Sequence, residues 1–457
     1  MSAISQASRR LGGLYRRQLL TNPRSFPKAT TRIHTFTTLA IESSCDDTCV
    51  ALLSTPDPRS SRFSTPFPAR LLFHGKSTSD NRAFQGVNPP LALTGHDRAI
   101  GPLLQQALGV LREEGAGDRP DLVAVTRGPG MSANLAVGLN VAKGLAVAWG
   151  VPLVGVNHMQ AHALTPRFVS ALSLSSHSSS LSDALPADAH SPAFPFLTLL
   201  VSGGHTMLVH SSALTTHRIL ACADNIALGD ALDKCARHIL PASSLAACPD
   251  VMYARALESF AFPTAAALAA HAYTPPARRV DEITPRPHAL GWALRPFLAG
   301  SRRLAYNFSD AESQVIHLLR ARPDIHKCTE ARRALAADVM RLVFEHLVGR
   351  VVLALEAQPE MRAHVKTLVV AGGVASNRFL MRVAREMLAA RGFSDVQLVV
   401  PPVQWCTDNA AMIAWTGVEM YAAGYESDLS ILPLRKWSVD PEVEGGILGQ
   451  EGWIKRG

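Results

Sequence analysis

The sequence predicts a two-lobed α/β fold in which one structural unit, of the order β-β-β-α-β-α, occurs twice. Short apolar runs of strand length alternate with stretches whose apolar residues follow helical spacing, which is the pattern of an α/β protein. Each half begins with a strand, a polar turn and a strand, and each later contains a strand, a glycine-rich turn and a helix. The glycine-rich turns are 128–130 and 372–373. Duplicated units of this kind form two lobes with a ligand cleft between them, and 457 residues suffice for two cores.

In the first half, strands are expected at 39–41, 49–53, 71–74, 122–125 and 151–156, and helices at 99–114 and 134–149. The turn between the first two strands, residues 42–48, is rich in hydroxyls and carries three acids. A solvated hairpin loop would have this composition too, but three carboxylates in one short turn favour a surface that faces a ligand.

Two histidines follow the strand at 151–156. His158 and His162 are four residues apart, so on a helix they lie on one face and can offer two nitrogen ligands to one divalent metal. The helix would open at the carboxyl end of a buried strand, where open α/β sheets bind ligands. Taken alone, the pair is more typical of partly buried structural histidines than of metal ligands.

The second half repeats this order. Strands are expected at 196–201, 207–209, 366–371 and 397–400, and helices from 229, from 330 to 356, after 377 and after 409. The turn 202–206 contains paired glycines, which leave room for a phosphate or a ribose against the backbone. Asp408 lies near the start of the last helix.

Composition divides the chain further. Residues 1–36 are predicted to be a mitochondrial transit peptide, 37–156 the N-terminal lobe, 157–425 the C-terminal lobe and 426–457 a tail. Two low-complexity insertions are expected within the second lobe, near 170–193 and 241–300, because their apolar periodicity is weak.

The basic character of the chain resides at its N-terminus. The net charge is +8, and seven positive charges without any acid lie in residues 1–41, which leaves one for the remainder. This Arg-, Ser- and Thr-rich stretch lacks the apolar core of a secretory signal, so a mitochondrial transit peptide is expected, with an RNA-binding basic arm as the alternative. The seven cysteines form no Cys-x-x-Cys pair, and no apolar run reaches the length of a membrane span.

These motifs together resemble the tRNA N6-adenosine threonylcarbamoyltransferase family of the actin/hexokinase/Hsp70-like (ASKHA) superfamily. The resemblance covers roughly residues 38–425, and it departs from the family pattern near 87–96, 241–258 and 307–313. The segments that carry it occur in the family's order: Ile41–Thr48, Gly128–Gly130, Ala136–Gly138, Asn157–His162, Leu200–His205, Gly229–Lys234, Ala371–Asn377 and Cys406–Met412.

The resemblance implies a role for each matching residue. The implied metal ligands are His158, His162 and Asp408, which would hold one divalent cation per subunit: zinc, iron or magnesium. The implied catalytic pair is Asp46 and Asp47. The positions implied to hold the threonylcarbamoyl-adenylate are Leu200, Val201, Ser202, Gly203, Gly204, Asp233 and Asn377.

The resemblance therefore implies a mitochondrial matrix acyltransferase. It would transfer the threonylcarbamoyl group from threonylcarbamoyl-AMP to the N6 amine of adenosine 37, beside the anticodon, in tRNAs that read codons beginning with adenine. Its partners would be tRNA and a second copy of the chain, without membrane insertion. Three arginine pairs, at 278–279, 302–303 and 332–333, are either tRNA contacts or solvated surface.

Three rival functions are considered. An ASKHA kinase or ATPase would share the glycine turns but would not need His158 and His162. An inactive scaffold of the same fold would bind nucleotide without turnover. A zinc peptidase of the zincin type requires Glu directly after the first histidine, where this chain has Met159, which argues against this rival.

Overall fold

The structure is a computed structural model that describes residues 35–60, 67–84, 86–176, 190–248 and 252–456. The predicted transit peptide lies almost wholly outside these residues. Among the described residues no helix combines the length and apolarity needed to cross a membrane.

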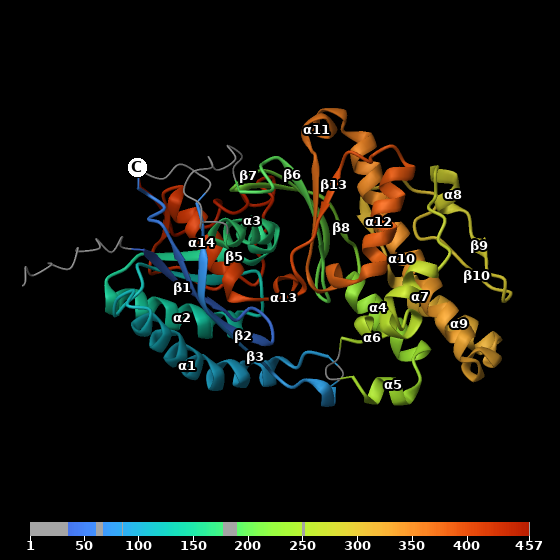
Figure 1. Cartoon of the computed structure of the whole chain (residues 1–457), viewed down its shortest axis with the longest axis horizontal. Helices are drawn as coiled ribbons and strands as arrows, with labels where there is room; N and C mark the ends of the chain where they lie inside the picture. The colour runs from blue at the N-terminus through green and yellow to red at the C-terminus, as the bar shows by residue number, and fades with distance from the viewer. Residues whose placement is uncertain (1–34, 61–66, 85, 177–189, 249–251, 457) are drawn as a thin grey trace, which may run out of the picture. The chain divides into compact units, whose positions relative to one another are not determined.

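The first sheet has the strand order β3-β2-β1-β4-β5 (Figure 1). Its strands are β1 (Phe36–Glu42), β2 (Asp47–Thr55), β3 (Arg70–Thr78), β4 (Leu122–Gly128) and β5 (Leu153–Asn157). The first three strands form an antiparallel meander, and β4 and β5 run parallel to β1. Consequently β1, β4 and β5 all end at the same edge of the sheet, which places Glu42, Gly128 and Asn157 there.

The second sheet repeats this arrangement in the order β11-β8-β7-β6-β12-β13. Its strands are β6 (Phe196–Val201), β7 (Thr206–Ala213), β8 (Thr216–Ala223), β11 (Ala305–Tyr306), β12 (Thr367–Ala371) and β13 (Gln397–Val399). The order 8-7-6-12-13 matches 3-2-1-4-5 of the first sheet, with β12 and β13 parallel to β6. The predicted two-lobed α/β architecture with a duplicated unit is thereby confirmed, and β8 and β11 are strands that the sequence analysis missed.

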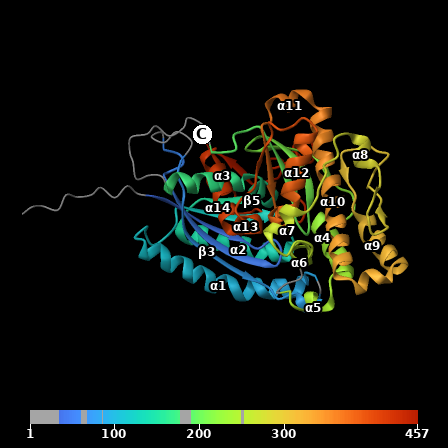
Figure 2. The ribbon, with the colours of Figure 1, turned by 45° about the vertical axis from the view of Figure 1, so that its right-hand side comes forward.

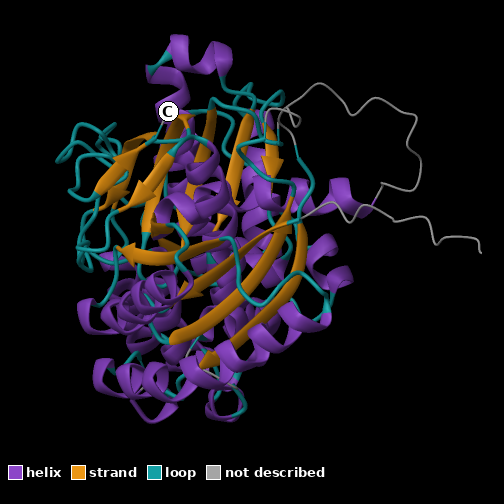
Figure 3. Cartoon of the chain, turned by 90° about the vertical axis from the view of Figure 1, so that its left-hand side faces the viewer, coloured by secondary structure: helices purple, strands orange, loops and turns teal. Residues whose placement is uncertain are grey.

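Helices form layers around the two sheets (Figures 1 and 3). The outer face of the first sheet is covered by α1 (Pro89–Glu113) and α2 (Ser132–Trp149), and the second sheet packs against α4 (Leu228–Ile239), α10 (Thr329–Ala357) and α12 (Arg378–Ala390). The remaining helices are α5 (Ala242–Ala246), α6 (Tyr253–Ala261), α7 (Ala265–Ala270), α8 (Arg279–Ile283), α9 (Ser309–Ala321), α11 (Pro359–His364) and α13 (Val403–Cys406), with short 3-10 turns at Arg82–Phe84, Pro323–Lys327 and Gly373–Ser376.

Two helices, α3 (His158–Ser176) and α14 (Ala410–Ala422), lie between the sheets (Figure 2). Their apolar residues share one core cluster with strands of both sheets, including Leu200 of β6 and Val369 of β12. Trp415 of α14 and Phe168 of α3 are fully buried there, with ring centroids 6.4 Å apart. The helix pair therefore determines how residues of the two halves meet.

The C-terminal residues belong to the same core. Trp437, Val439 and Ile447 are buried in the cluster that contains α14 and β1. A short antiparallel ladder of β14 (Tyr425–Ser427) and β15 (Trp453–Lys455) closes this region. The lobe boundaries at 157 and 425 stay a prediction, but α14 packs on the first sheet although it follows the whole second half in sequence.

Residues 252–300, part of the low-complexity insertion expected near 241–300, are folded. They form α6 to α8 and the short ladder of β9 (Arg286–Pro287) and β10 (Ala293–Leu294), and Leu257, Phe262 and Trp292 are buried in the core of the second half. The weak periodicity reflects short elements separated by prolines. Of the other predicted insertion, residues 177–189 lie outside the described residues, whereas the ring of His190 packs against Trp415.

Candidate functional site

The side chains of His158, His162 and Asp408 converge between the two sheets. His158 and His162 occupy the first two turns of α3, and Asp408 directly precedes the N-cap of α14. The Oδ1 atom of Asp408 lies 3.3 Å from Nε2 of His158 and 3.1 Å from Nε2 of His162. Within the described parts of the chain this is the one group of His, Cys, Asp or Glu side chains arranged to hold a metal ion, with ligand atoms within 4.8 Å of one another.

Asparagine caps fix both helix starts. The Asn157 side chain accepts hydrogen bonds from the amides of Met159 and Gln160 at 2.9 and 3.2 Å, and the Asn409 side chain accepts one from Met412 at 2.9 Å. Such caps satisfy amides that the helix itself leaves free. The ligand positions are therefore set by backbone geometry on two packed helices.

Glu42, at the end of β1, binds the ring nitrogen of His158 that points away from Asp408. Its Oε2 atom accepts a hydrogen bond from Nδ1 of His158 at 3.0 Å and another from the hydroxyl of Thr126, and its Oε1 accepts the amide of Ser44 at 2.6 Å. The carboxylate is fully buried. This arrangement directs Nε2 of His158 toward Asp408, as in carboxylate–histidine–metal triads. Sequence reasoning placed Glu42 only in a polar turn, because its partner follows 116 residues later.

The acidic pair is anchored unequally. Asp47 accepts hydrogen bonds from Nζ of Lys76 and from the Thr78 hydroxyl, both at 2.5 Å. Asp46 accepts one from Nδ2 of Asn81 at 3.0 Å. Burial raises the pKa of Asp47 to about 6, against the opposing effect of Lys76.

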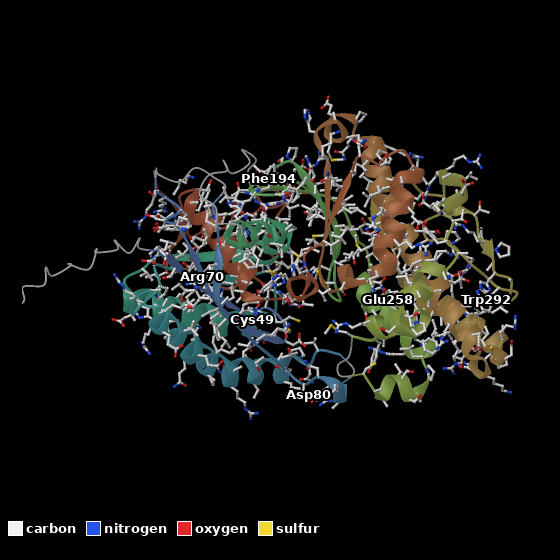
Figure 4. All side chains as sticks on the ribbon, viewed as in Figure 1. Cys49, Arg70, Asp80, Phe194, Glu258 and Trp292 are labelled. Carbon is white, nitrogen blue, oxygen red and sulfur yellow. The ribbon has the colours of Figure 1, made fainter. Side chains whose placement is uncertain are left out.

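Lys76 and Cys49 connect this acidic pair to the Asp408 backbone. Lys76 Nζ lies 3.3 Å from the carbonyl oxygen of Asp408, and the thiol of Cys49, labelled in Figure 4, donates to the same oxygen at 3.8 Å. The acidic turn and the turn before α14 are therefore adjacent, although they are more than 300 residues apart in sequence.

The Ser-Gly-Gly turn uses much of its own hydrogen-bonding capacity. The Ser202 amide donates to the carbonyl of His205 at 2.8 Å, and the Ser202 hydroxyl accepts the amide of Gly204 at 3.3 Å. Of the three amides at 202–204, only that of Gly203 donates to no described residue. A Cβ atom at Gly203 or Gly204 would meet nothing within 4 Å, so a ligand can approach the backbone there.

The other implied adenylate residues are less exposed. Leu200 and Val201 are 3% and 0% exposed in β6, so their side chains belong to the core. Asp233 accepts the amide of Ala254 at 2.6 Å at the start of α6, and the buried Asn377 caps α12 by accepting the amide of Leu380 at 2.9 Å. These two polar side chains thus help to build the edge of the second sheet.

His205 is a neighbour of the metal ligands that sequence reasoning did not single out. Desolvation, followed by the charges of His158 and His162, lowers its pKa to about 4. We expect a neutral ring at physiological pH, and the residue as a whole is exposed to solvent. Because His205 directly follows the Ser-Gly-Gly turn, the charges of the metal ligands act on that end of the turn.

The arginine pairs proposed as tRNA contacts are engaged in local interactions. Arg278 and Arg279 pair with Asp281 and Glu282. Arg302 and Arg303 pair with Glu356 and Asp224, and Arg332 donates to the carbonyl of Ile239 at 3.1 Å. These local contacts engage much of the charge of the pairs, and the choice between tRNA contact and solvated surface stays a prediction.

The donor set fits a divalent metal. Two imidazole nitrogens and one carboxylate leave coordination positions open for a substrate oxygen. Nitrogen donors suit zinc or iron(II) better than magnesium, which prefers oxygen ligands.

Comparison with known proteins gives the family. The model of the family described as tRNA N6-adenosine threonylcarbamoyltransferase (TsaD) matches residues 72–415. The mitochondrial tRNA N6-adenosine threonylcarbamoyltransferase of Schizosaccharomyces pombe is 34% identical over 92% of this chain and 90% of its own length. The Sinorhizobium medicae enzyme is 32% identical over 90% of this chain and 97% of its own. Among solved structures, the one titled "Crystal structure of T.kodakarensis HypF" aligns over 85% of this chain and 48% of its own, with 12% identity and a TM-score of 0.45. By its sequence, the chain belongs to the tRNA N6-adenosine threonylcarbamoyltransferase family.

Proposed function

We propose that the protein transfers the threonylcarbamoyl group from threonylcarbamoyl-AMP to the N6 amine of adenosine 37 in mitochondrial tRNAs that read codons beginning with adenine. The observation that carries the proposal is the convergence of His158, His162 and Asp408 beside the acidic turn and the Ser-Gly-Gly turn. A metal held there supplies Lewis-acid polarisation of carbonyl or phosphate oxygens.

Of the two acids, Asp46 is the better proton acceptor for the attacking amine. The carboxylate of Asp47 is committed to Lys76 and Thr78 on β3. Asp46 is held less tightly: Asn81 donates to its Oδ2 at 3.0 Å, and it forms no ion pair with a described residue. The N6 amine would attack the carbamoyl carbon, its proton would pass to Asp46, and AMP would leave. The amide of Gly203, which donates to no described residue, would bind an oxygen of the adenylate.

The test is reconstitution with an unmodified tRNA transcript and threonylcarbamoyl-AMP, followed by nucleoside analysis. The wild type should form the modified nucleoside. Asp46→Asn should lower turnover by roughly two to four orders of magnitude, the range for a lost general base. Asp80→Asn is the matched control, since its side chain is 61% exposed and pairs with Arg82 on the same loop (Figure 4).

The same reconstitution, repeated with ATP and with measurement of released or transferred phosphate, separates the rivals. ATP hydrolysis or phosphate transfer without modified nucleoside would favour a kinase or ATPase of this fold. Binding of the adenylate without any turnover would favour the scaffold. Either outcome in the wild type would overturn the proposal.

We also propose that the protein acts in the mitochondrial matrix. The support is the acid-free basic leader and the name of the S. pombe relative. A fusion of residues 1–36 to the N-terminus of a fluorescent protein should be imported into mitochondria, and the leader should be cleaved from it. A diffuse cytosolic signal would contradict this.

A homodimer is proposed on the surface of α2. This helix carries a single charged residue, Lys143, and exposes Val147 by 63%. Sedimentation should give a dimer that Val147→Asp disrupts and Val403→Asp, at a comparably exposed position outside α2, does not. A monomeric wild type would contradict the proposal.

A further inference from the structure

The segment from Leu434 to Trp437 is fixed against the elements that carry the site. The Leu434 amide donates to the carbonyl of Arg127 at 2.8 Å, and the Gly130 amide donates to the carbonyl of Arg435 at 3.3 Å. The side chain of Asn157 donates to the carbonyl of Trp437 at 3.2 Å. Trp437 is 3% exposed. The backbone on either side of Arg435 and Lys436 is therefore held by the glycine turn after β4 and by the residue before His158.

A short chain of contacts leads from this segment to the metal ligands. The amide of Met131 donates to the carbonyl of Ser44 at 3.0 Å. A Cβ atom on Gly130 would lie 2.8 Å from the same oxygen, so only glycine allows this approach. The hydroxyl of Ser44 lies 3.4 Å from Nδ1 of His158. Arg435 is therefore linked to the acidic turn, residues 42–48, by the contacts of Gly130 with Arg435 and with Ser44.

The side chains of Arg435 and Lys436 are exposed and uncommitted. Neither forms an ion pair or a side-chain hydrogen bond with any described residue. This distinguishes them from the arginines at 278–279, 302–303 and 332, whose side chains are engaged locally.

Binding of an RNA beside the metal ligands requires nearby cations, because both the site and the RNA are negatively charged. The site itself is acidic, with Glu42, Asp46, Asp47 and Asp408 close together, and a nucleic acid brought to it carries one negative charge per phosphate. Without the basic leader the chain has a net charge near +1, so the attraction must come from local cations. Arginine and lysine held on a rigid backbone beside the site meet this requirement.

We propose that Arg435 and Lys436 bind backbone phosphates of the substrate tRNA next to the modified adenosine. The inference rests on the proposed function, and it assigns the pair to positioning of the RNA rather than to chemistry. Phosphate contacts of this kind fix the register of a nucleic acid without reading its bases. The C-terminal segment would then form part of the tRNA-binding surface.

The test compares the full chain with the variant Arg435→Glu/Lys436→Glu. Binding of an unmodified tRNA transcript is measured over a range of salt concentrations, together with steady-state turnover. The variant should bind at least about tenfold more weakly at low salt, and the slope of log Kd against log salt should decrease by about one to two, since each lost phosphate contact removes somewhat less than one. KM for tRNA should rise while kcat stays close to the wild-type value, and metal content should be unchanged.

The matched control is Arg320→Glu/Lys327→Glu, which reverses two exposed cations at and after the end of α9. It makes the same change in net charge, so an effect of overall charge would appear in both variants. The leader is common to all proteins compared and does not affect the difference. Arg435→Gln/Lys436→Gln serves if the reversal fails to fold.

Equal slopes and affinities within twofold of the wild type would overturn the inference, as would equal losses in the control. Modified nucleoside is measured on the same wild-type preparation. Its formation together with an unaffected 435–436 variant would refute this inference alone, whereas its absence would refute the proposed function.

Discussion

The buried carboxylate of Glu42 determines which nitrogen of His158 faces the metal position. Replacing it by glutamine keeps the shape but removes the charge that favours a proton on Nδ1. We expect Glu42→Gln to weaken metal binding by about 10- to 100-fold, the usual effect of losing such a partner. Metal titration with a competing chelator measures this.

Glu258→Gln provides the comparison for that prediction. Glu258, labelled in Figure 4, is another buried carboxylate, and it accepts the amides of Arg378 and Phe379 at the start of α12. Its substitution should leave metal affinity unchanged. Equal losses in both variants would indicate general destabilisation instead of a role for Glu42.

The raised pKa of Asp47 predicts that the stability of the folded protein depends on pH. Its pKa rises from 3.8 to about 6 in the folded protein, chiefly through burial, so between these values the folded state binds more protons than the unfolded state. The free energy of unfolding contributed by this group must therefore fall as pH rises from about 4 to about 6. Relative to the wild type, Asp47→Asn should gain up to ~3 kcal/mol between pH 4 and pH 7. Denaturant unfolding at both pH values checks this, and a constant difference would contradict it.

At the level of elements, the five-residue helix α8 is too short to be stable by itself and is stabilised by ion pairs. Arg279 pairs with Glu282, and Arg391 of the turn after α12 lies 3.3 Å from the same carboxylate. The Glu282 side chain is 4% exposed. Arg279→Glu would leave two carboxylates together in a buried position, and we expect a loss of about 3 to 5 kcal/mol in unfolding free energy.

Its neighbour Arg278 supplies the control, because that side chain is 77% exposed. Arg278→Glu should change the free energy of unfolding far less than Arg279→Glu does, because solvent screens an exposed ion pair. Neither variant should change the salt dependence of tRNA binding. A weaker salt dependence in Arg278→Glu would return this surface to the candidates for RNA contact.

At the scale of the whole molecule, the two sheets are joined through α3 and α14 by apolar packing, independently of any metal. Phe168, Trp415 and Met412 are buried in the shared cluster. Chelation should therefore abolish turnover but leave the circular dichroism spectrum intact, and the melting temperature should fall only by the linkage effect of ligand release.

Zinc or iron(II) should restore the activity of the chelated protein, and magnesium should not, given the two nitrogen ligands. The variant His158→Ala should not be rescued by added metal. Loss of the folded state on chelation would show that the metal contributes to the structure as well.

The sequence by itself determined features that repeat over short distances. The spacing of His158 and His162 after a buried strand was sufficient to place both rings on one helix face, because helical period is a local property. The alternation of strands, glycine turns and helices was sufficient for the duplicated α/β fold. These patterns need no knowledge of what packs against them.

The tertiary structure alone decided which distant groups meet. Asp408 meets His162, 246 positions earlier in the sequence, only because α14 packs against the first sheet. Glu42 meets His158 only because β1 ends beside the start of α3. In the same way, whether an arginine is free or paired depends on neighbours such as Glu356, 54 residues away from Arg302. The type of a residue determines its chemistry, but long-range packing determines its partner. Such packing leaves no periodic pattern in the local sequence, so it cannot be predicted from that sequence.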